Sequence, residues 1–313
     1  MWIGEPSLRG RTLSGVLGAL VVAASAHGAA AGRLRVCQEQ EQAYAQIKPT
    51  ATPLEVNAAL FSAADKGCLA LARQLLEDGA SLQARDRFGA MALSRAAKAG
   101  QAEIADLFLQ HGAAIDTRDL DGSTALYLAA ENNKREAVAA LIGHGADVNL
   151  PGRSGIAPLA AAAYSGRADL VGLLLDHGAD INAVDGTGKS AICYAAGRGF
   201  PDVVRLLLDR GVDPNLRYGN DLTALMWAAG YSDEAGTSDI EVTLKLLIDR
   251  GARLDDKDNR GRTALMIAAS LGHTSAAEQL LSRGANVGGR DKSGKSAGDL
   301  AASEALRAML TAR

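Results

Sequence analysis

The sequence predicts an all-α fold, a solenoid of stacked helix-turn-helix units joined by short β-hairpin loops. Three observations support this prediction: glycine-alanine or glycine-valine pairs recur every 33 residues, a doubled alanine recurs with the same rhythm, and each unit holds two apolar segments at helical spacing. One unit of this size cannot bury its apolar side alone, whereas stacked neighbours can. The repeats are therefore expected to stack in series.

The repeat is regular except at one place. The glycines of its glycine pairs lie 33 residues apart, with one spacing of 40, and are Gly79, Gly112, Gly145, Gly178, Gly211, Gly251 and Gly284. The doubled alanines begin at Ala63, Ala96, Ala129, Ala162, Ala195, Ala228 and Ala268. The long spacing places the surplus residues between the two helices of the sixth unit, in the segment 230–239.

Residues 152–185 show how one unit is expected to fold. The segment APLAAAAYSG predicts a short first helix whose small side chains let a neighbour approach closely. The segment RADLVGLLLDHG predicts a second helix, with Leu170, Val171 and Leu174 at helical spacing. Gly178 follows this helix, where a left-handed C-cap favours a residue without Cβ, and ADINAVDGTG predicts a turn.

The segments LLLDHGADINAVD (173–185) and LIGHGADVNLPG (141–152) resemble the second helix and hairpin of the ankyrin repeat family. The resemblance covers roughly residues 54–310 and implies seven repeats followed by a short C-terminal remnant. The family's TPLH motif is never intact, so the hydrogen bonds of its histidine are expected to be missing; it reads TALY at 124, APLA at 157, SAIC at 190, and TALM at 223 and 263. Gly298 stands where the family packs leucine, which makes the last unit resemble a worn terminal cap.

The N-terminal residues have the pattern of a secretory signal peptide. Arg9 and Arg11 precede an uncharged run over 13–26, which ends in the small residues Ala-Ser-Ala. The alternative is an uncleaved membrane anchor, because the uncharged run can be extended to Gly32. Cleavage predicts a periplasmic or secreted protein. The predicted organisation is a signal peptide over 1–26, a lead-in segment over 27–53, and the repeat domain with its cap over 54–313.

The three cysteines are too few for a disulfide framework and show no zinc-binding spacing. In an oxidising compartment, Cys37 and Cys68 could pair and hold residues 37–54 against the first repeat. The sequence leaves this pairing open, because it does not set the geometry. Cys193 is expected to be a small buried thiol.

Several patterns resemble chemical sites but favour a structural explanation. The segment GRDKSGKS (289–296) matches a phosphate-binding loop, yet no apolar strand precedes it. His111, His144 and His177 share one repeat position, and helices packed 8–10 Å apart keep such residues from sharing a metal ion. These histidines are expected to bond carbonyls at the helix ends, as are the basic residues at the same position in later repeats, Arg210, Arg250 and Arg283.

No grouping of nucleophile, base and acid falls within one unit, so we predict a protein that is not an enzyme and holds no cofactor or metal. The net charge of −3 and a pI of about 6.0 argue against a nucleic-acid partner. A membrane partner is expected only if the signal peptide stays in place.

Aromatic residues mark the surface expected to bind a partner. Residues beside the doubled alanines and at the hairpin tips face the partner in the ankyrin family, which implies binding roles for Phe88, Tyr164, Tyr194, Trp227 and Tyr231. Exposed Tyr and Trp beside Arg are typical of interface hot spots. The alternative for Tyr194 and Trp227 is half-buried packing. The insertion 230–239 is expected to form one side of this groove, or else to be a neutral surface insertion.

The sequence thus predicts a non-catalytic scaffold that binds another protein, of unknown identity, in the cell envelope or periplasm. The alternative is an inhibitor or immunity-type protein that masks an envelope hydrolase or toxin.

Overall fold

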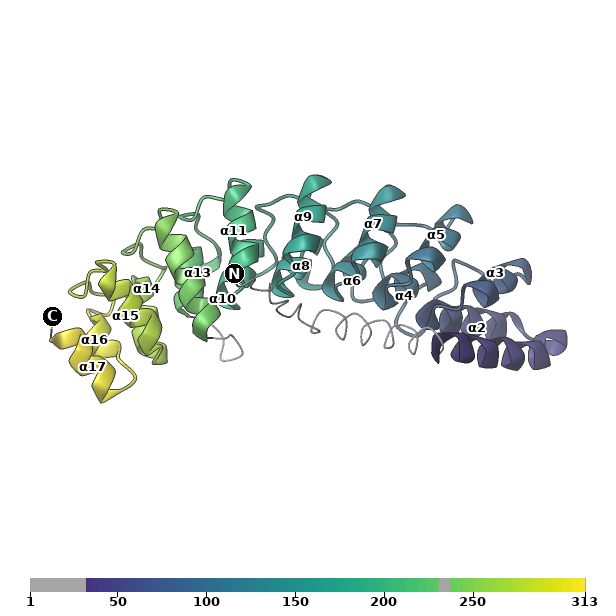
Figure 1. Ribbon diagram of the computed structural model, residues 1–313, viewed down its shortest axis with the longest axis horizontal. Coiled ribbons are helices and arrows are strands. Elements are labelled where there is room, and N and C mark those ends of the chain that lie inside the picture. Colours follow the sequence, from purple (N-terminus) through teal and green to yellow (C-terminus); the bar gives the residue numbers. More distant parts are fainter. Residues whose placement is uncertain (1–31, 231–236, 313) are drawn as a thin grey trace, which may run out of the picture. The chain divides into compact units, whose positions relative to one another are not determined.

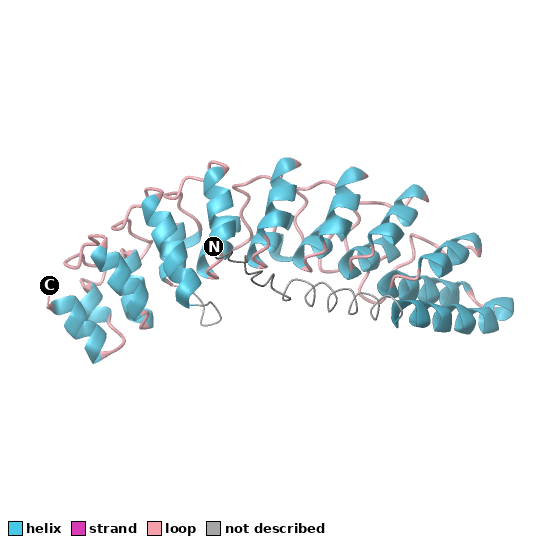
Figure 2. Ribbon diagram, viewed as in Figure 1, coloured by secondary structure: helices cyan, strands magenta, loops and turns pink. Residues whose placement is uncertain are grey.

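The computed structural model describes residues 32–230 and 237–312, which fall into two compact units, one ending at Ser81 and one beginning at Leu82. These residues form helices joined by loops and contain no strand, apart from one isolated bridge between Tyr218 and Leu222 (Figure 2). The predicted all-α repeat fold is confirmed. The signal peptide predicted over 1–26 and the side chain of Tyr231 lie outside the described residues.

The first unit contains a helix over 32–47, a 3₁₀ turn η1 (Lys48–Thr50), and the helix pair α2 (Pro53–Lys66) and α3 (Leu69–Glu77). Helix α2 begins at a capping box, in which Thr52 and Glu55 satisfy each other's backbone amides. It ends at Gly67, whose φ of +79° places it in the left-handed region.

The helix over 32–47 is held against this pair at both ends. A disulfide joins Cys37 to Cys68, which is 2% exposed. Near the other end, the Tyr44 hydroxyl donates to Asp78 Oδ2 at 3.0 Å, and Lys48 Nζ lies 2.8 Å from the same oxygen. The lead-in segment therefore contributes a helix that covers the first pair.

The second unit repeats the helix pair. Figure 1 shows the outer helices α5, α7, α9 and α11 in one row and the inner helices α4, α6, α8 and α10 in a second row beneath them. The inner helices are α4 (Ala92–Ala99), α6 (Ala125–Glu131), α8 (Pro158–Tyr164), α10 (Ala191–Gly197), α12 (Ala224–Ala229) and α14 (Ala264–Leu271). The outer helices are α5 (Ala102–Gln110), α7 (Arg135–Gly143), α9 (Ala168–Asp176), α11 (Pro201–Asp209), α13 (Thr237–Asp249) and α15 (Thr274–Ser282).

Each inner helix packs on the next inner helix. The doubled alanines explain this close packing, since both residues of each pair in the second unit are 0% exposed. Threonine side chains cap three of the inner helices by accepting a hydrogen bond from the amide three residues later, namely Thr124, Thr223 and Thr263.

The turns before the inner helices are held by aspartate. In five of them, one carboxylate oxygen accepts hydrogen bonds from the amides two and four residues later; these residues are Asp86, Asp119, Asp185, Asp258 and Asp291. Successive turns are also joined through the backbone, as where the Leu120 amide donates to the Phe88 carbonyl at 3.1 Å. The turns include the 3₁₀ segments η2 (Arg153–Gly155) and η3 (Gly219–Asp221).

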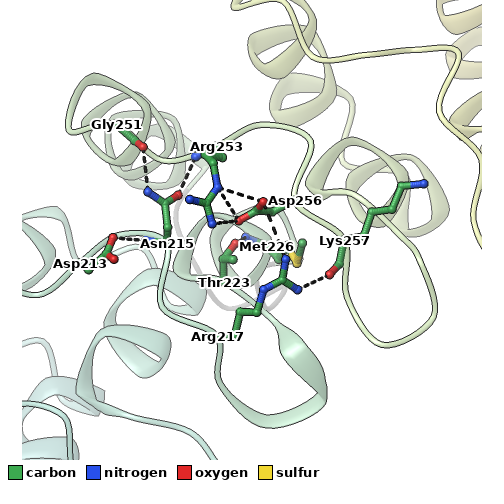
Figure 3. A network of polar contacts seen from close by, with 9 residues as sticks. All are labelled: Asp213, Asn215, Arg217, Thr223, Met226, Gly251, Arg253, Asp256 and Lys257. Carbon is green, nitrogen blue, oxygen red and sulfur yellow. Dashed lines mark hydrogen bonds and ion pairs between the residues drawn. The ribbon is translucent and has the colours of Figure 1, made fainter.

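Polar side chains also set the register between outer loops. The Asn215 side chain donates to the Gly251 carbonyl at 3.0 Å and accepts from the Arg253 amide at 2.8 Å, while Arg253 pairs with Asp256 (Figure 3). Asn149 makes the same two bonds to Gly178 and Asp180. The hydrogen bonds of each asparagine side chain thus fix the distance between its loop and the loop of the next repeat.

Tyr127 stands where the TPLH motif has its histidine, and its side chain makes a hydrogen bond within its own helix. The Tyr127 hydroxyl donates to Glu131 Oε1 at 3.1 Å, and its ring is 1% exposed. Gly152 occupies the position at which other turns have aspartate, and a Cβ there would overlap the Tyr127 ring. The ring therefore fills the space that the aspartate side chain takes elsewhere.

The C-terminal end differs from the other repeats. Helix α16 (Ala297–Leu300) is short, and α17 (Glu304–Thr311) packs against it. A Cβ on Gly298 would lie 3.1 Å from Thr311 Cγ2. Glycine at this position lets α17 approach and cover α16.

Candidate protein-binding face

Three predicted aromatic residues come together on consecutive inner helices. Tyr164 ends α8, Tyr194 lies in α10 and Trp227 lies in α12; we call these three the aromatic row. Tyr164 is 49% exposed, whereas Tyr194 and Trp227 are half-buried. The ring centroids of Tyr164 and Tyr194 are 5.7 Å apart in an edge-to-face arrangement.

Two cations lie over the aromatic row. The guanidinium of Arg198 is 4.3 Å from the centroid of Tyr164. Lys189 Nζ lies 5.6 Å from the centroid of Tyr194 and 5.3 Å from that of Trp227. These distances are within the range of cation–π attraction, so the face combines aromatic rings with positive charge.

Asp185, in the turn before α10, is 8% exposed and holds the side chain of Tyr194 in place. The Tyr194 hydroxyl donates to Asp185 Oδ2, while Oδ1 accepts from the amides of Thr187 at 2.7 Å and Lys189 at 3.0 Å. Burial alone would raise the pKa of Asp185, but hydrogen bonds from Tyr194 and Thr187 outweigh it and lower the pKa. Burial, together with the bond to Asp185, raises the pKa of Tyr194. At neutral pH the carboxylate is therefore charged and the phenol is its donor.

This bond predicts a pH dependence. Because the folded-state pKa of Asp185 lies below its unfolded value of about 3.9, its contribution to stability is complete above that value and is lost as the pH falls through the folded pKa. We expect Asp185→Asn to lose less stability than the unchanged chain on acidification from pH 5 to about pH 3. Urea unfolding across this range measures the difference, and equal losses in the two proteins would contradict it.

The other predicted aromatic residues do not join this group. Phe88 is 60% exposed at the turn before α4, with the Arg87 guanidinium 4.7 Å from its centroid. It lies beside Leu120, which is 76% exposed, and forms a separate apolar tip. The segment 231–236, which holds Tyr231, is not among the described residues, so its predicted role stays a prediction.

The repeated basic residues are structural. The Nδ1–H groups of His111 and His177 donate to the carbonyls of Leu107 and Leu173, both at 2.8 Å, as expected. His144 and the three arginines differ from the expectation, because their side chains pair with carboxylates of the preceding outer helix. His144 lies 3.0 Å from Asp106, and the three arginines form the pairs Arg210–Asp176, Arg250–Asp209 and Arg283–Asp249.

The remaining chemical candidates have local explanations. In the segment 289–296, Asp291 accepts the amides of Ser293 and Lys295, and it thereby occupies donors that a phosphate would need. Cys193 is 1% exposed, and burial raises its pKa to about 11. Within the described ranges, no group of three or more His, Cys, Asp or Glu could hold a metal ion. In the same residues, no helix is both long and apolar enough to span a membrane.

Lys189 and Asp185 were not singled out from the sequence. Their signal is the turn segment DGTGK, whose aspartate recurs at the repeat spacing as Asp86, Asp119 and Asp258. The pattern predicts a turn, but it does not show which side chain takes the second carboxylate oxygen.

Comparison with known protein families supports the repeat that the sequence predicts. A family model described as ankyrin repeats (3 copies) matches residues 60–152, 149–218 and 213–291. A search of curated proteins found no match to the chain.

Proposed function

Because the chain belongs to the ankyrin repeat family, whose repeats generally bind other proteins, we propose that it is a non-catalytic scaffold that binds a partner protein through the aromatic row. The observation that carries this proposal is the Tyr164 ring, which is 49% exposed and held between Tyr194 and Arg198. Interface hot spots are enriched in Tyr, Trp and Arg.

Rigidity supports the proposal further. The aromatic row stands on helices rather than on loops, and the hydrogen bond from Tyr194 to Asp185 fixes the central ring. A ring that is already ordered loses little conformational entropy when a partner covers it. The face is therefore suited to recognition without rearrangement.

We further propose that the partner lies in the cell envelope, the periplasm or the extracellular space. The N-terminal pattern of a signal peptide supports this location. The disulfide between Cys37 and Cys68 supports it as well, since disulfides persist in oxidising compartments.

In-cell crosslinking of the tagged chain, followed by mass spectrometry, tests the binding role. We expect one partner to be captured by the unchanged chain and lost with Tyr164→Ala. Val242→Ala is the matched control, because Val242 is also exposed but lies on the outer helix α13. Equal capture by all three proteins would exclude the aromatic row as the binding site.

With the purified partner, Tyr164→Ala and Trp227→Ala are each expected to weaken binding by about 2 kcal/mol, because both truncate an aromatic side chain of the proposed binding face. Isothermal titration calorimetry measures the change. Circular dichroism melts of each variant separate lost binding from lost folding, which matters most for the half-buried Trp227. Unchanged affinity in folded variants would refute the prediction.

A further inference from the structure

Lys189 differs from the residue at the same repeat position near the C-terminal end. There, Arg262 pairs with the turn aspartate Asp258, whose Oδ2 lies 2.9 Å from the guanidinium. Asp185 is the corresponding aspartate before α10, but its Oδ2 accepts the Tyr194 hydroxyl instead. Tyr194 has thus taken the carboxylate that would pair with Lys189.

The ammonium of Lys189 rests between two rings as a result. No carboxylate among residues 32–230 and 237–312 forms an ion pair with it. The carboxylate of Glu131, on the inner helix α6, pairs with Arg153 and accepts the Tyr127 hydroxyl, so it is not a partner of Lys189 either. Aromatic faces attract the charge but accept only weak hydrogen bonds, whereas an ammonium has three N–H donors. A carboxylate from outside would add a charge-assisted hydrogen bond.

The spacing of the face suits an extended chain. The Tyr194 centroid lies 5.7 Å from that of Tyr164 and 5.6 Å from Lys189 Nζ, so the exposed ring and the cation both adjoin Tyr194. Alternate side chains of an extended segment point to one side and are about 7 Å apart. The side chain of one residue in such a segment can therefore reach Lys189 while the side chain two residues away packs on Tyr164.

We infer that the aromatic row binds an acidic, extended segment of the partner, with an Asp or Glu carboxylate on Lys189 and an apolar side chain on Tyr164. This inference rests on the proposed function and names the chemical class of its partner. The positive charges of Lys189 and Arg198 on this face complement such a segment, although the chain as a whole carries a net charge of −3.

The test uses the full chain and a fluorescein-labelled peptide of about eight residues in which glutamate and leucine alternate. The comparison peptide has glutamine in place of glutamate. By fluorescence anisotropy, we expect the glutamate peptide to bind about fivefold more tightly, and added salt to reduce the difference. No binding of the glutamate peptide, or equal binding of both peptides, would overturn the inference.

Three variants assign the effect to one side chain. Lys189→Met keeps the length of the side chain and is expected to remove the preference for glutamate, whereas Lys189→Arg retains it. Lys245→Met removes an exposed lysine from the outer helix α13 and is expected to change nothing. A preference that survives Lys189→Met in a folded protein would overturn the assignment to Lys189.

Two further outcomes distinguish an acidic peptide from the alternatives, a nucleic acid and a protein segment that is not acidic. Tighter binding of a labelled oligothymidine through Lys189 would replace the acidic peptide by a nucleic acid. Equal capture of the cellular partner by Lys189→Met and by the unchanged chain, with capture still lost in Tyr164→Ala, would overturn the acidic class alone. The proposed protein-binding role of the face would then stand.

Discussion

Breaking the Cys37–Cys68 disulfide is expected to lower the free energy of unfolding of the first unit by about 3–4 kcal/mol. The bond joins residues 31 positions apart, so its loss restores the entropy of that loop to the unfolded chain. The helix over 32–47 would then be held by the contacts of Tyr44 and Lys48 with Asp78. Hydrogen exchange of amides in α2 and α3, measured with and without reductant, reports this loss.

Cys37→Ala provides the matched variant, because Cys37 is only half-buried and its truncation removes little packing. We expect this variant to exchange as fast without reductant as the reduced chain does, and reductant to have no further effect on it. Cys193→Ala is the control, since that thiol forms no disulfide. Identical exchange of the oxidised chain and Cys37→Ala would show that the bond contributes nothing to stability.

Gly152→Ala is expected to destabilise the second unit by about 3 kcal/mol, because the added methyl group would overlap the buried Tyr127 ring. The φ of Gly152 is −89°, so the effect comes from the ring and not from a left-handed backbone. Urea unfolding followed by circular dichroism measures the change. Gly143→Ala is the control, since a Cβ there meets nothing within 4 Å and alanine favours the helix α7.

A double-mutant cycle links the loss to Tyr127. Tyr127→Ala alone is expected to cost about 3–5 kcal/mol through the cavity that it leaves. In the double variant, the Gly152→Ala methyl group no longer meets the ring. The double variant is therefore expected to lose less stability than the sum of the losses in the two single variants. Additive losses would mean that the ring and the turn do not compete for the same space.

The local pattern of the chain was enough to predict the repeat, and with it most of the helices. Periodic apolar residues, doubled alanines and glycines after the outer helices are read within a single unit, and each acts on backbone atoms close by in the chain. The repeat register also placed Tyr164, Tyr194 and Trp227 on consecutive inner helices. Register alone did not distinguish the exposed Tyr164 from its half-buried neighbours.

The tertiary structure decided the contacts for which several side chains compete. Asp185 could bond Lys189 or Tyr194, and the structure shows that the phenol takes the oxygen and leaves the lysine between two rings. Two further contacts depend on the tertiary structure in the same way. Arg210 pairs with Asp176 of the preceding outer helix, and the Tyr127 ring fills the space beside Gly152. The sequence by itself thus determined the helix pairs, because these follow from periodicity, while its resemblance to ankyrin repeats indicated the family and the face of the aromatic row. Which charges on that face stay open to a partner depends on distances between side chains of different turns and helices, and only the folded chain sets those distances.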